Sequence, residues 1–184
     1  MRIVVAGAGA VGRHLASDLH KRGHEVTLIE QDPRHLEAAA EQAPEIEYVL
    51  GDACEPWVLE KADVRAADVV VDLRHPHRGE VSGTLARAMQ CGRATIVSGT
   101  GTYLDVPPEM VVHVSPGPVE PEELAAAIGR LLEDERLRAR IGEAARAHMA
   151  ELARSDRTAR VYAEAIEGTL ALLADPSRRA LARW

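Results

Sequence analysis

The spacing of three glycines near the start of the chain limits the fold more than any other feature of the sequence. Gly7, Gly9 and Gly12 follow a short apolar run at residues 3–6 and begin a segment with helical periodicity. A second apolar run then ends on an acid, Glu30. The order of strand, glycine loop, helix and strand is typical of a unit that binds a nucleotide at the carboxyl ends of parallel strands.

Each part of this unit has a physical role in such a site. Gly7 permits a tight turn, Gly9 lets a pyrophosphate approach the backbone, and Gly12 lets the helix lie close to the strand. Glu30 is placed to accept hydrogen bonds from ribose hydroxyls, which favours NAD over NADP. The alternative is a retained scaffold that binds nothing. Free N–H groups at the helix start favour an anion, so the predicted phosphate site is Gly7, Gly9, Ala10, Val11 and Gly12.

Composition excludes several classes of function. The net charge of −7 argues against general nucleic-acid binding. No apolar run approaches the roughly 20 residues of a membrane span, and no signal peptide is visible. The two cysteines, Cys54 and Cys91, give neither a disulfide framework nor metal-ligand spacing. We therefore expect a cytoplasmic protein with no resident metal.

The order of apolar runs predicts an α/β fold. Strands are expected at residues 46–50, 68–73, 94–97 and 110–114, in addition to the first two, with helices between most of them. This pattern predicts a Rossmann-like doubly wound parallel sheet of about six strands in the order 3-2-1-4-5-6. Helices are expected at 122–133, 135–153 and 156–174. We expect one nucleotide-binding domain at residues 1–154, with residues 155–184 packing on it as a last helix and tail.

Three motifs in the first part of the chain match one family in order. They are GAGAVGRHLA, LIEQDP and GDACEPWVLEKADVRAADVVV, within residues 1–71. This segment resembles the nucleotide-binding domain of the KTN or RCK family of potassium-transport regulators. The resemblance implies that the ligand is NAD(H) or an adenine nucleotide such as ADP or ATP. It also implies nucleotide contacts for Asp52 and Ala53, beside the glycines and Glu30. Cys54 stands where that family usually has Thr, and Asp52 has an alternative role as a turn former that caps the next helix.

Residues 67–170 are similar to another family. The turn Gly-Glu-x-Ser-Gly, the helix ending AMQCG, the run TIVSGTG and the segment PGPVEPEELAAAI resemble the second half of the donor domain of group 1, GT-B-fold glycosyltransferases. The resemblance implies a UDP- or GDP-sugar as an alternative ligand. Glu80 would contact the sugar, and Ser82, Gly83 and Thr84 would face the diphosphate. The alternative is an ordinary helix start capped by Ser82.

The two resemblances join on the fourth predicted strand, near residues 67–73. Arg74, His75, His77 and Arg78 follow it as a positive cluster, and Arg74 is our candidate among them for a phosphate contact. No acid, base or nucleophile stands out for catalysis, so a binding module is favoured over an enzyme. The alternatives are a nucleotide-sugar-binding donor half, and a recombined or designed chimeric fold with no selected activity. The apolar face of the last helix suggests a homodimer.

Overall fold

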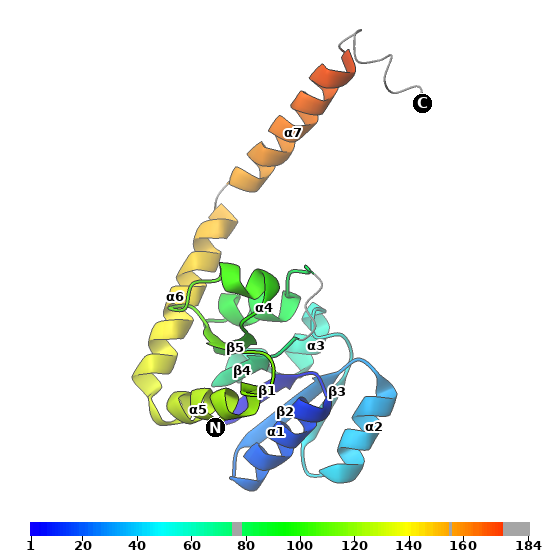
Figure 1. Ribbon diagram of the computed structural model, residues 1–184, viewed down its shortest axis with the longest axis vertical. Coiled ribbons are helices and arrows are strands. Elements are labelled where there is room, and N and C mark those ends of the chain that lie inside the picture. The colour runs from blue at the N-terminus through cyan, green and yellow to red at the C-terminus, as the bar shows by residue number, and fades with distance from the viewer. Residues whose placement is uncertain (75–78, 155, 175–184) are drawn as a thin grey trace. The chain divides into compact units, whose positions relative to one another are not determined.

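The computed structural model describes residues 1–74, 79–154 and 156–174. It contains a sheet of six parallel strands in the order β3-β2-β1-β4-β5-β6, with helices on both faces (Figure 1). The predicted Rossmann-like doubly wound parallel sheet is therefore confirmed. The strands are β1 (Arg2–Ala6), β2 (Glu25–Glu30), β3 (Glu47–Leu50), β4 (Val69–Asp72), β5 (Ala94–Ser98) and β6 (Val112–Val114).

The helix boundaries lie close to the predicted ranges. Two short 3₁₀ turns, η1 (Val64–Ala66) and η2 (Gly101–Asp105), were not predicted, because such short turns leave no periodic hydrophobic signal. The helices are α1 (Ala10–Lys21), α2 (Pro33–Gln42), α3 (Pro56–Lys61), α4 (Gly83–Gln90), α5 (Glu120–Glu133), α6 (Glu135–Arg154) and α7 (Arg157–Ala174).

The start of α2 shows how local sequence sets an element boundary. The Asp32 side chain accepts a hydrogen bond from the Arg34 backbone N–H at 2.9 Å, and Pro33 is the first helical residue. The Arg34 side chain and then its backbone N–H, both hydrogen-bonded to Asp32, hold the pKa of that carboxyl below its usual range. Asp32 is therefore the N-cap of α2.

Helices cover both faces of the sheet. Because successive side chains of a strand point in opposite directions, both sets of side chains are buried. Ile3 and Val5 of β1 pack with α1, α2 and α5 on one face, whereas Val4 packs with α3 and α4 on the other (Figure 1). The chain contains no Phe, and the core consists mostly of valine, alanine, leucine and isoleucine. The two central strands, β1 and β4, are accordingly mostly apolar, with the sequences RIVVA and VVVD.

The position of β1 between β2 and β4 creates the crevice in which ligands of such sheets bind. Ala6, the last residue of β1, is in register with Ile29 of β2 and with Asp72 of β4. The carboxyl ends of the three strands therefore lie at the same edge. The Gly7 N–H continues the ladder by donating to the Ile29 carbonyl at 2.8 Å. The glycine loop consequently starts at the edge where Glu30 and Asp72 also lie.

The chain divides into two compact units, Met1–Met149 and Ala150–Trp184. The first holds the sheet and α1 to α5, and α7 is the main described element of the second. That residues 155–184 pack on the sheet domain stays a prediction, and the tail after residue 174 lies outside the described residues. No helix in the described ranges is both long and apolar enough to cross a membrane.

A close contact between α6 and the turn after α4 gives a test of the packing. A Cβ added at Gly142 would lie 2.1 Å from the Gly92 carbonyl oxygen, and that oxygen belongs to backbone. We expect Gly142→Ala to lower the free energy of unfolding by about 1–3 kcal/mol, measured by urea denaturation. Gly129→Ala in α5 is the matched control, because no atom lies within 4 Å of its added Cβ.

The control should raise the free energy of unfolding by about 0.5–1 kcal/mol, since alanine is the better helix former. If the two substitutions changed stability by the same amount, the close packing of α6 on the Gly92 turn would be contradicted.

Candidate functional site

The glycine loop has the backbone geometry that its spacing predicts. Gly7 has a φ of +102°, a conformation that favours glycine. A Cβ on Gly12 would lie 1.9 Å from the Gly7 carbonyl oxygen, so a larger residue would push α1 away from the loop. Gly9 differs from Gly12, because no atom of the described residues lies within 4 Å of the place where the Cβ of a larger residue at position 9 would be. The face of the loop at Gly9 is therefore open to an incoming group.

Glu30 does more within the fold than was predicted. The residue is 8% exposed, and its carboxylate accepts two backbone hydrogen bonds, from Ala8 N–H at 2.6 Å and from Asp32 N–H at 2.8 Å. It therefore connects the glycine loop to the start of α2. Each carboxylate oxygen has a second lone pair, so these bonds leave acceptor capacity for a ribose hydroxyl.

A first pocket of about 180 Å³ lies at the carboxyl ends of β1 to β4. Asp52 is exposed there and accepts a hydrogen bond from the Cys54 N–H at 2.8 Å, which makes it a turn former. It does not cap α3, whose N-cap is Glu55. The pocket brings together six of the predicted site residues: Gly7, Glu30, Asp52, Ala53, Arg74 and Thr84.

A second pocket of about 260 Å³ lies on the other side of the glycine loop. Ala6, Gly7 and Leu73 line both pockets, so the loop separates two halves of one crevice. Apolar side chains from β1, α1 and β4 form most of the second pocket, and one carboxylate, Glu120 of α5, joins them. Its other lining residues are Val5, Gly9, Ala10, Val11, Gly12, Leu15 and Val71.

The start of α4 contacts the chain's own loop. The Ser82 hydroxyl accepts a hydrogen bond from the Leu85 N–H at 3.2 Å, which confirms its role as an N-cap. A Cβ on Gly83 would lie 3.0 Å from Cys54 Cβ, and Thr84 donates its hydroxyl to the Ala53 carbonyl at 2.9 Å. Glycine at position 83 thus permits close packing of the 53–54 loop. Glu80, Ser82 and Gly83 line neither pocket at the glycine loop.

A buried polar cluster at the end of β4 was missed by the sequence analysis. Asp72 is 2% exposed, and its Oδ2 accepts hydrogen bonds from Ser82 Oγ at 2.6 Å and from the Tyr103 hydroxyl at 2.8 Å. Burial, and then the Asp72 charge, raise the pKa of Tyr103 above its usual value. An acid that ends a buried apolar run, as in DVVVDL, was the signal that could have identified Asp72.

Arg74 lies beside this cluster. Its backbone N–H donates to Ser98 Oγ at 3.0 Å, and its guanidinium lies 3.3 Å from the Glu80 carboxylate. Burial lowers the pKa of Arg74, but Tyr103, Asp72, Cys54 and Glu80 together raise it by more, so the net shift is upward. The side chain is therefore a firmly charged group at the edge of the first pocket.

A second cation near the loop was also missed. The Arg13 guanidinium donates to the Ala8 carbonyl at 3.1 Å, which holds it against the glycine loop. Its position directly after Gly12 was the available signal. The positive cluster predicted at His75, His77 and Arg78 lies outside the described residues.

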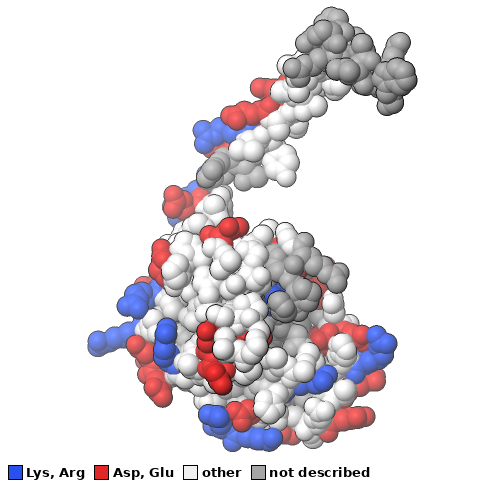
Figure 2. Space-filling model, viewed as in Figure 1, with Lys and Arg blue, Asp and Glu red and all other residues white. Residues whose placement is uncertain are grey.

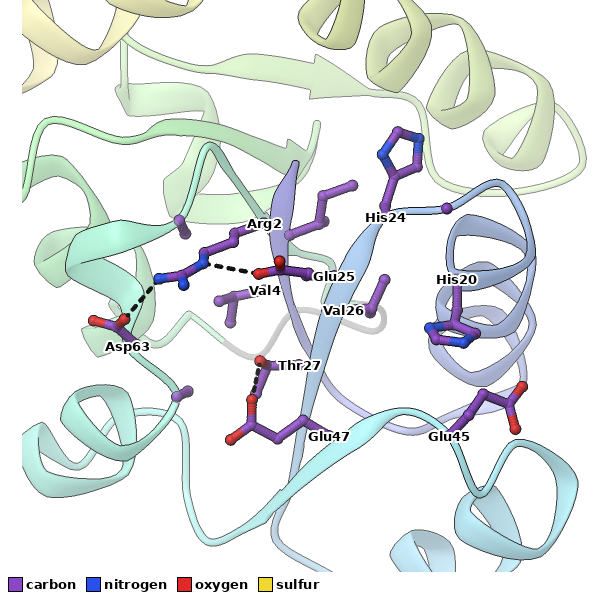
Figure 3. A pocket seen from close by; sticks show the side chains of 14 residues that line it. Arg2, Val4, His20, His24, Glu25, Val26, Thr27, Glu45, Glu47 and Asp63 are labelled. Atoms are coloured by element: carbon purple, nitrogen blue, oxygen red, sulfur yellow. Dashed lines mark hydrogen bonds and ion pairs between the residues drawn. The ribbon is translucent and has the colours of Figure 1, made fainter.

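A larger pocket, of about 710 Å³, lies at the opposite edge of the sheet (Figure 3). Three of its charged groups are paired, because Arg2 contacts Glu25 at 2.9 Å and Asp63 at 3.2 Å, and Glu47 accepts a hydrogen bond from the Thr27 hydroxyl at 3.1 Å. Ligands of open α/β sheets bind outside the carboxyl ends of strands. Although it is smaller, the crevice at the glycine loop is therefore the candidate site.

Within the described residues, no group of three or more His, Cys, Asp or Glu could hold a metal ion.

The first half of the chain matches a known family. Residues 3–98 match the TrkA-N domain, and they make up more than half of the 184 residues. The Trk system potassium uptake protein TrkA of Mycobacterium tuberculosis is 52% identical over 71 residues, which are 39% of this chain and 31% of that protein. The chain thus spans about a third of the length of this curated relative.

Solved structures resemble the chain over a longer range. Sucrose-phosphate synthase from Thermosynechococcus elongatus has a TM-score of 0.68 at 20% identity, covering 92% of this chain and 46% of that one. HepE from Anabaena in complex with UDP has a TM-score of 0.65 at 18% identity, covering 88% and 48%. At these identities the likeness concerns the fold. The two resemblances predicted from sequence, to the TrkA-N type of domain and to glycosyltransferases, are confirmed.

The buried cluster at Asp72 can be tested through its tyrosine. Tyr103→Phe removes one of the two hydrogen bonds to the Asp72 carboxylate and should lower the free energy of unfolding by about 1.5–3 kcal/mol. Ser115→Ala is the control, because it removes a hydroxyl from an exposed residue, and it should change that free energy by less than about 0.5 kcal/mol. Equal effects in urea denaturation would contradict a stabilising role for the Tyr103 hydroxyl.

Proposed function

The chain belongs to the TrkA-N domain family, and on that premise we propose that it is a nucleotide-binding module for NAD(H) or an adenine nucleotide. The observation that carries the proposal is the open face of the glycine loop at Gly9, with a pocket on each side. A ligand with a pyrophosphate in its middle matches this arrangement, because its two ends would enter the two pockets.

The phosphate contacts would come from the backbone. Helix α1 begins at Ala10, and the N–H groups of its first turn have no partner within the helix. They carry a partial positive charge that favours an anion, and the Arg13 guanidinium lies near the same loop. This arrangement would hold phosphates without a lysine.

The ribose would bind in the first pocket. Glu30 and Asp52 both line it, and carboxylates are good acceptors for ribose hydroxyls. A 2′-phosphate at the same place would meet the Glu30 charge in a half-enclosed site, which favours NAD over NADP. Arg74, on the opposite wall, would contribute a positive charge toward the phosphates.

Binding without catalysis is the function that these residues favour. Among the described residues that line the two pockets there is no His, Cys, Lys or Ser, and the Thr84 hydroxyl is bonded to Ala53. The site therefore offers groups that hold a ligand rather than groups that move protons.

Free thiols at Cys54 and Cys91 suit a reducing compartment, so we propose a cytoplasmic location.

Calorimetric titration with ADP and NADH tests the proposal. Gly9→Ala should keep the stability of the protein, because its φ of −61° suits alanine, and should lower nucleotide affinity at least about tenfold. The reason is that a methyl group would stand where the pyrophosphate approaches. Gly129→Ala, a remote substitution of the same kind, should leave affinity unchanged. No binding at millimolar nucleotide would overturn the proposal and favour a recombined or designed fold with no selected activity.

A nucleotide-sugar-binding donor half is the second candidate, because the fold resembles that of a glycosyltransferase from Rickettsia africae over 82% of the chain. HepE was solved in complex with UDP, which makes UDP-glucose a suitable competing ligand in the same titration. Tighter binding of UDP-glucose than of ADP, weakened by Glu80→Ala, would favour this candidate. We rank it second because Gly83 packs against Cys54 and the Thr84 hydroxyl is already bonded to the Ala53 carbonyl.

We also propose that α7 mediates self-association. Its exposed apolar side chains are Val161, Tyr162, Ile166, Leu170, Leu172 and Leu173. The charged residues Arg160, Glu164 and Glu167 are spaced i, i+4 and i+7, so they share one side of the helix. Figure 2 shows uncharged surface along much of the rest of α7. Such a face is stabilised when a second copy covers it.

Sedimentation velocity tests the role of α7. We expect a dimer for the wild-type chain and a monomer for Ile166→Glu, since the new carboxylate would have to be buried without a partner. Ala171→Glu is the matched control, because Ala171 lies on the same side as Glu164 and Glu167, and it should stay dimeric. A monomeric wild-type chain would refute self-association. If Ile166→Glu and Ala171→Glu abolished the dimer equally, the assignment of the apolar face of α7 as the interface would be refuted.

A further inference from the structure

The second pocket contains a carboxylate that the nucleotide fold does not require. Glu120 is half-buried at the start of α5, and it lines the pocket together with Gly9 and Val11 at the start of α1. Among the described residues that line this pocket, Glu120 is the only one with a charged side chain. The other walls come mainly from Val5, Leu15, Val71 and Leu73, so the charge stands in an apolar surrounding.

The local structure explains why Glu120 is available for a ligand. The Glu120 N–H donates to the Gly117 carbonyl at 3.1 Å, which closes the turn that precedes α5. Glu123, one turn further, uses its carboxylate to accept the Ser115 N–H at 2.6 Å. Within the described ranges the Glu120 carboxylate makes no such contact. Helix α5 packs on the same face of the sheet as α1, and this packing brings Glu120 beside the glycine loop.

The two pockets differ in chemistry, and this difference indicates which end of a ligand each pocket would bind. The first pocket offers Glu30 and Asp52 to ribose hydroxyls, and Arg74 lies on its wall. The second offers apolar walls and one negative charge. Apolar walls suit the faces of a flat ring, and a carboxylate beside them favours a ring that carries positive charge.

We propose that the second pocket receives the oxidised nicotinamide ring of a dinucleotide, and that Glu120 gives the module a preference for NAD⁺ over NADH. This inference rests on the proposed nucleotide-binding function. The two ligands have nearly the same shape, but the oxidised ring carries a positive charge that the reduced ring lacks. Glu120 also repels the pyrophosphate, which both ligands carry, so the ratio of the two affinities reports the ring contact alone.

Titration calorimetry of the full chain with ADP-ribose, NAD⁺ and NADH tests the inference. ADP-ribose lacks the nicotinamide ring and therefore measures the rest of the site. A partly exposed charge pair changes affinity by up to about fivefold, so we expect NAD⁺ to bind about fivefold more tightly than NADH. Glu120→Gln should bring the ratio close to one without weakening ADP-ribose. Glu122→Gln should keep the preference, because Glu122 is an exposed acid in the same helical turn and does not line the pocket.

The outcomes separate this inference from the proposed function. If ADP-ribose binds while NAD⁺ and NADH bind equally, or if the preference survives Glu120→Gln, the role of Glu120 is refuted and the nucleotide site remains. If Glu122→Gln abolishes the preference as fully as Glu120→Gln does, a general charge effect replaces the specific contact. If none of the three ligands binds at millimolar concentration, the proposed function fails as well.

Discussion

The contact between Gly12 and the Gly7 carbonyl is the constraint on which the site depends. It sets the distance of α1 from the end of β1, because any side chain at Gly12 would overlap with backbone. The Glu30 carboxylate then holds the loop between them by accepting the Ala8 N–H. A buried carboxylate that accepts two backbone N–H groups makes charge-assisted hydrogen bonds, which are stronger than neutral ones. The glycine loop is consequently shaped by the fold itself, with its open side at Gly9.

The two halves of the chain contribute differently to this crevice. The first half supplies the loop, the acids Glu30 and Asp52, and the start of α1. The sequence of the second half predicts that the helix after the fourth strand faces a diphosphate, yet α4 begins against the chain's own loop, with Thr84 bonded to Ala53. What the second half supplies instead is the buried cluster around Asp72, which positions the strand end that carries Arg74. It also supplies α5, which brings Glu120 to the crevice.

Most of the fold could be predicted because its signals are local. Strands that are buried on both faces leave continuous apolar runs, and caps such as Asp32 and Ser82 mark where helices begin. The strand order followed from the βαβ pattern, since right-handed crossovers leave few arrangements. Site residues within the first motif were predicted for the same reason. Asp72, Tyr103 and Glu120 were not, because nothing near them in sequence indicates their partners.

The sequence by itself determined the parallel sheet, the glycine loop and the acid at the end of β2, because each depends on side chains that are neighbours along the chain. The tertiary structure alone decided which helix starts remain open to a ligand. Gly9 and Gly83 both precede or begin a helix in sequence, but a Cβ at Gly83 would meet Cys54, whereas a Cβ at Gly9 would meet no atom of the described residues within 4 Å. Access to a helix terminus depends on which distant loop covers it, and that is a property of packing between segments far apart in the chain.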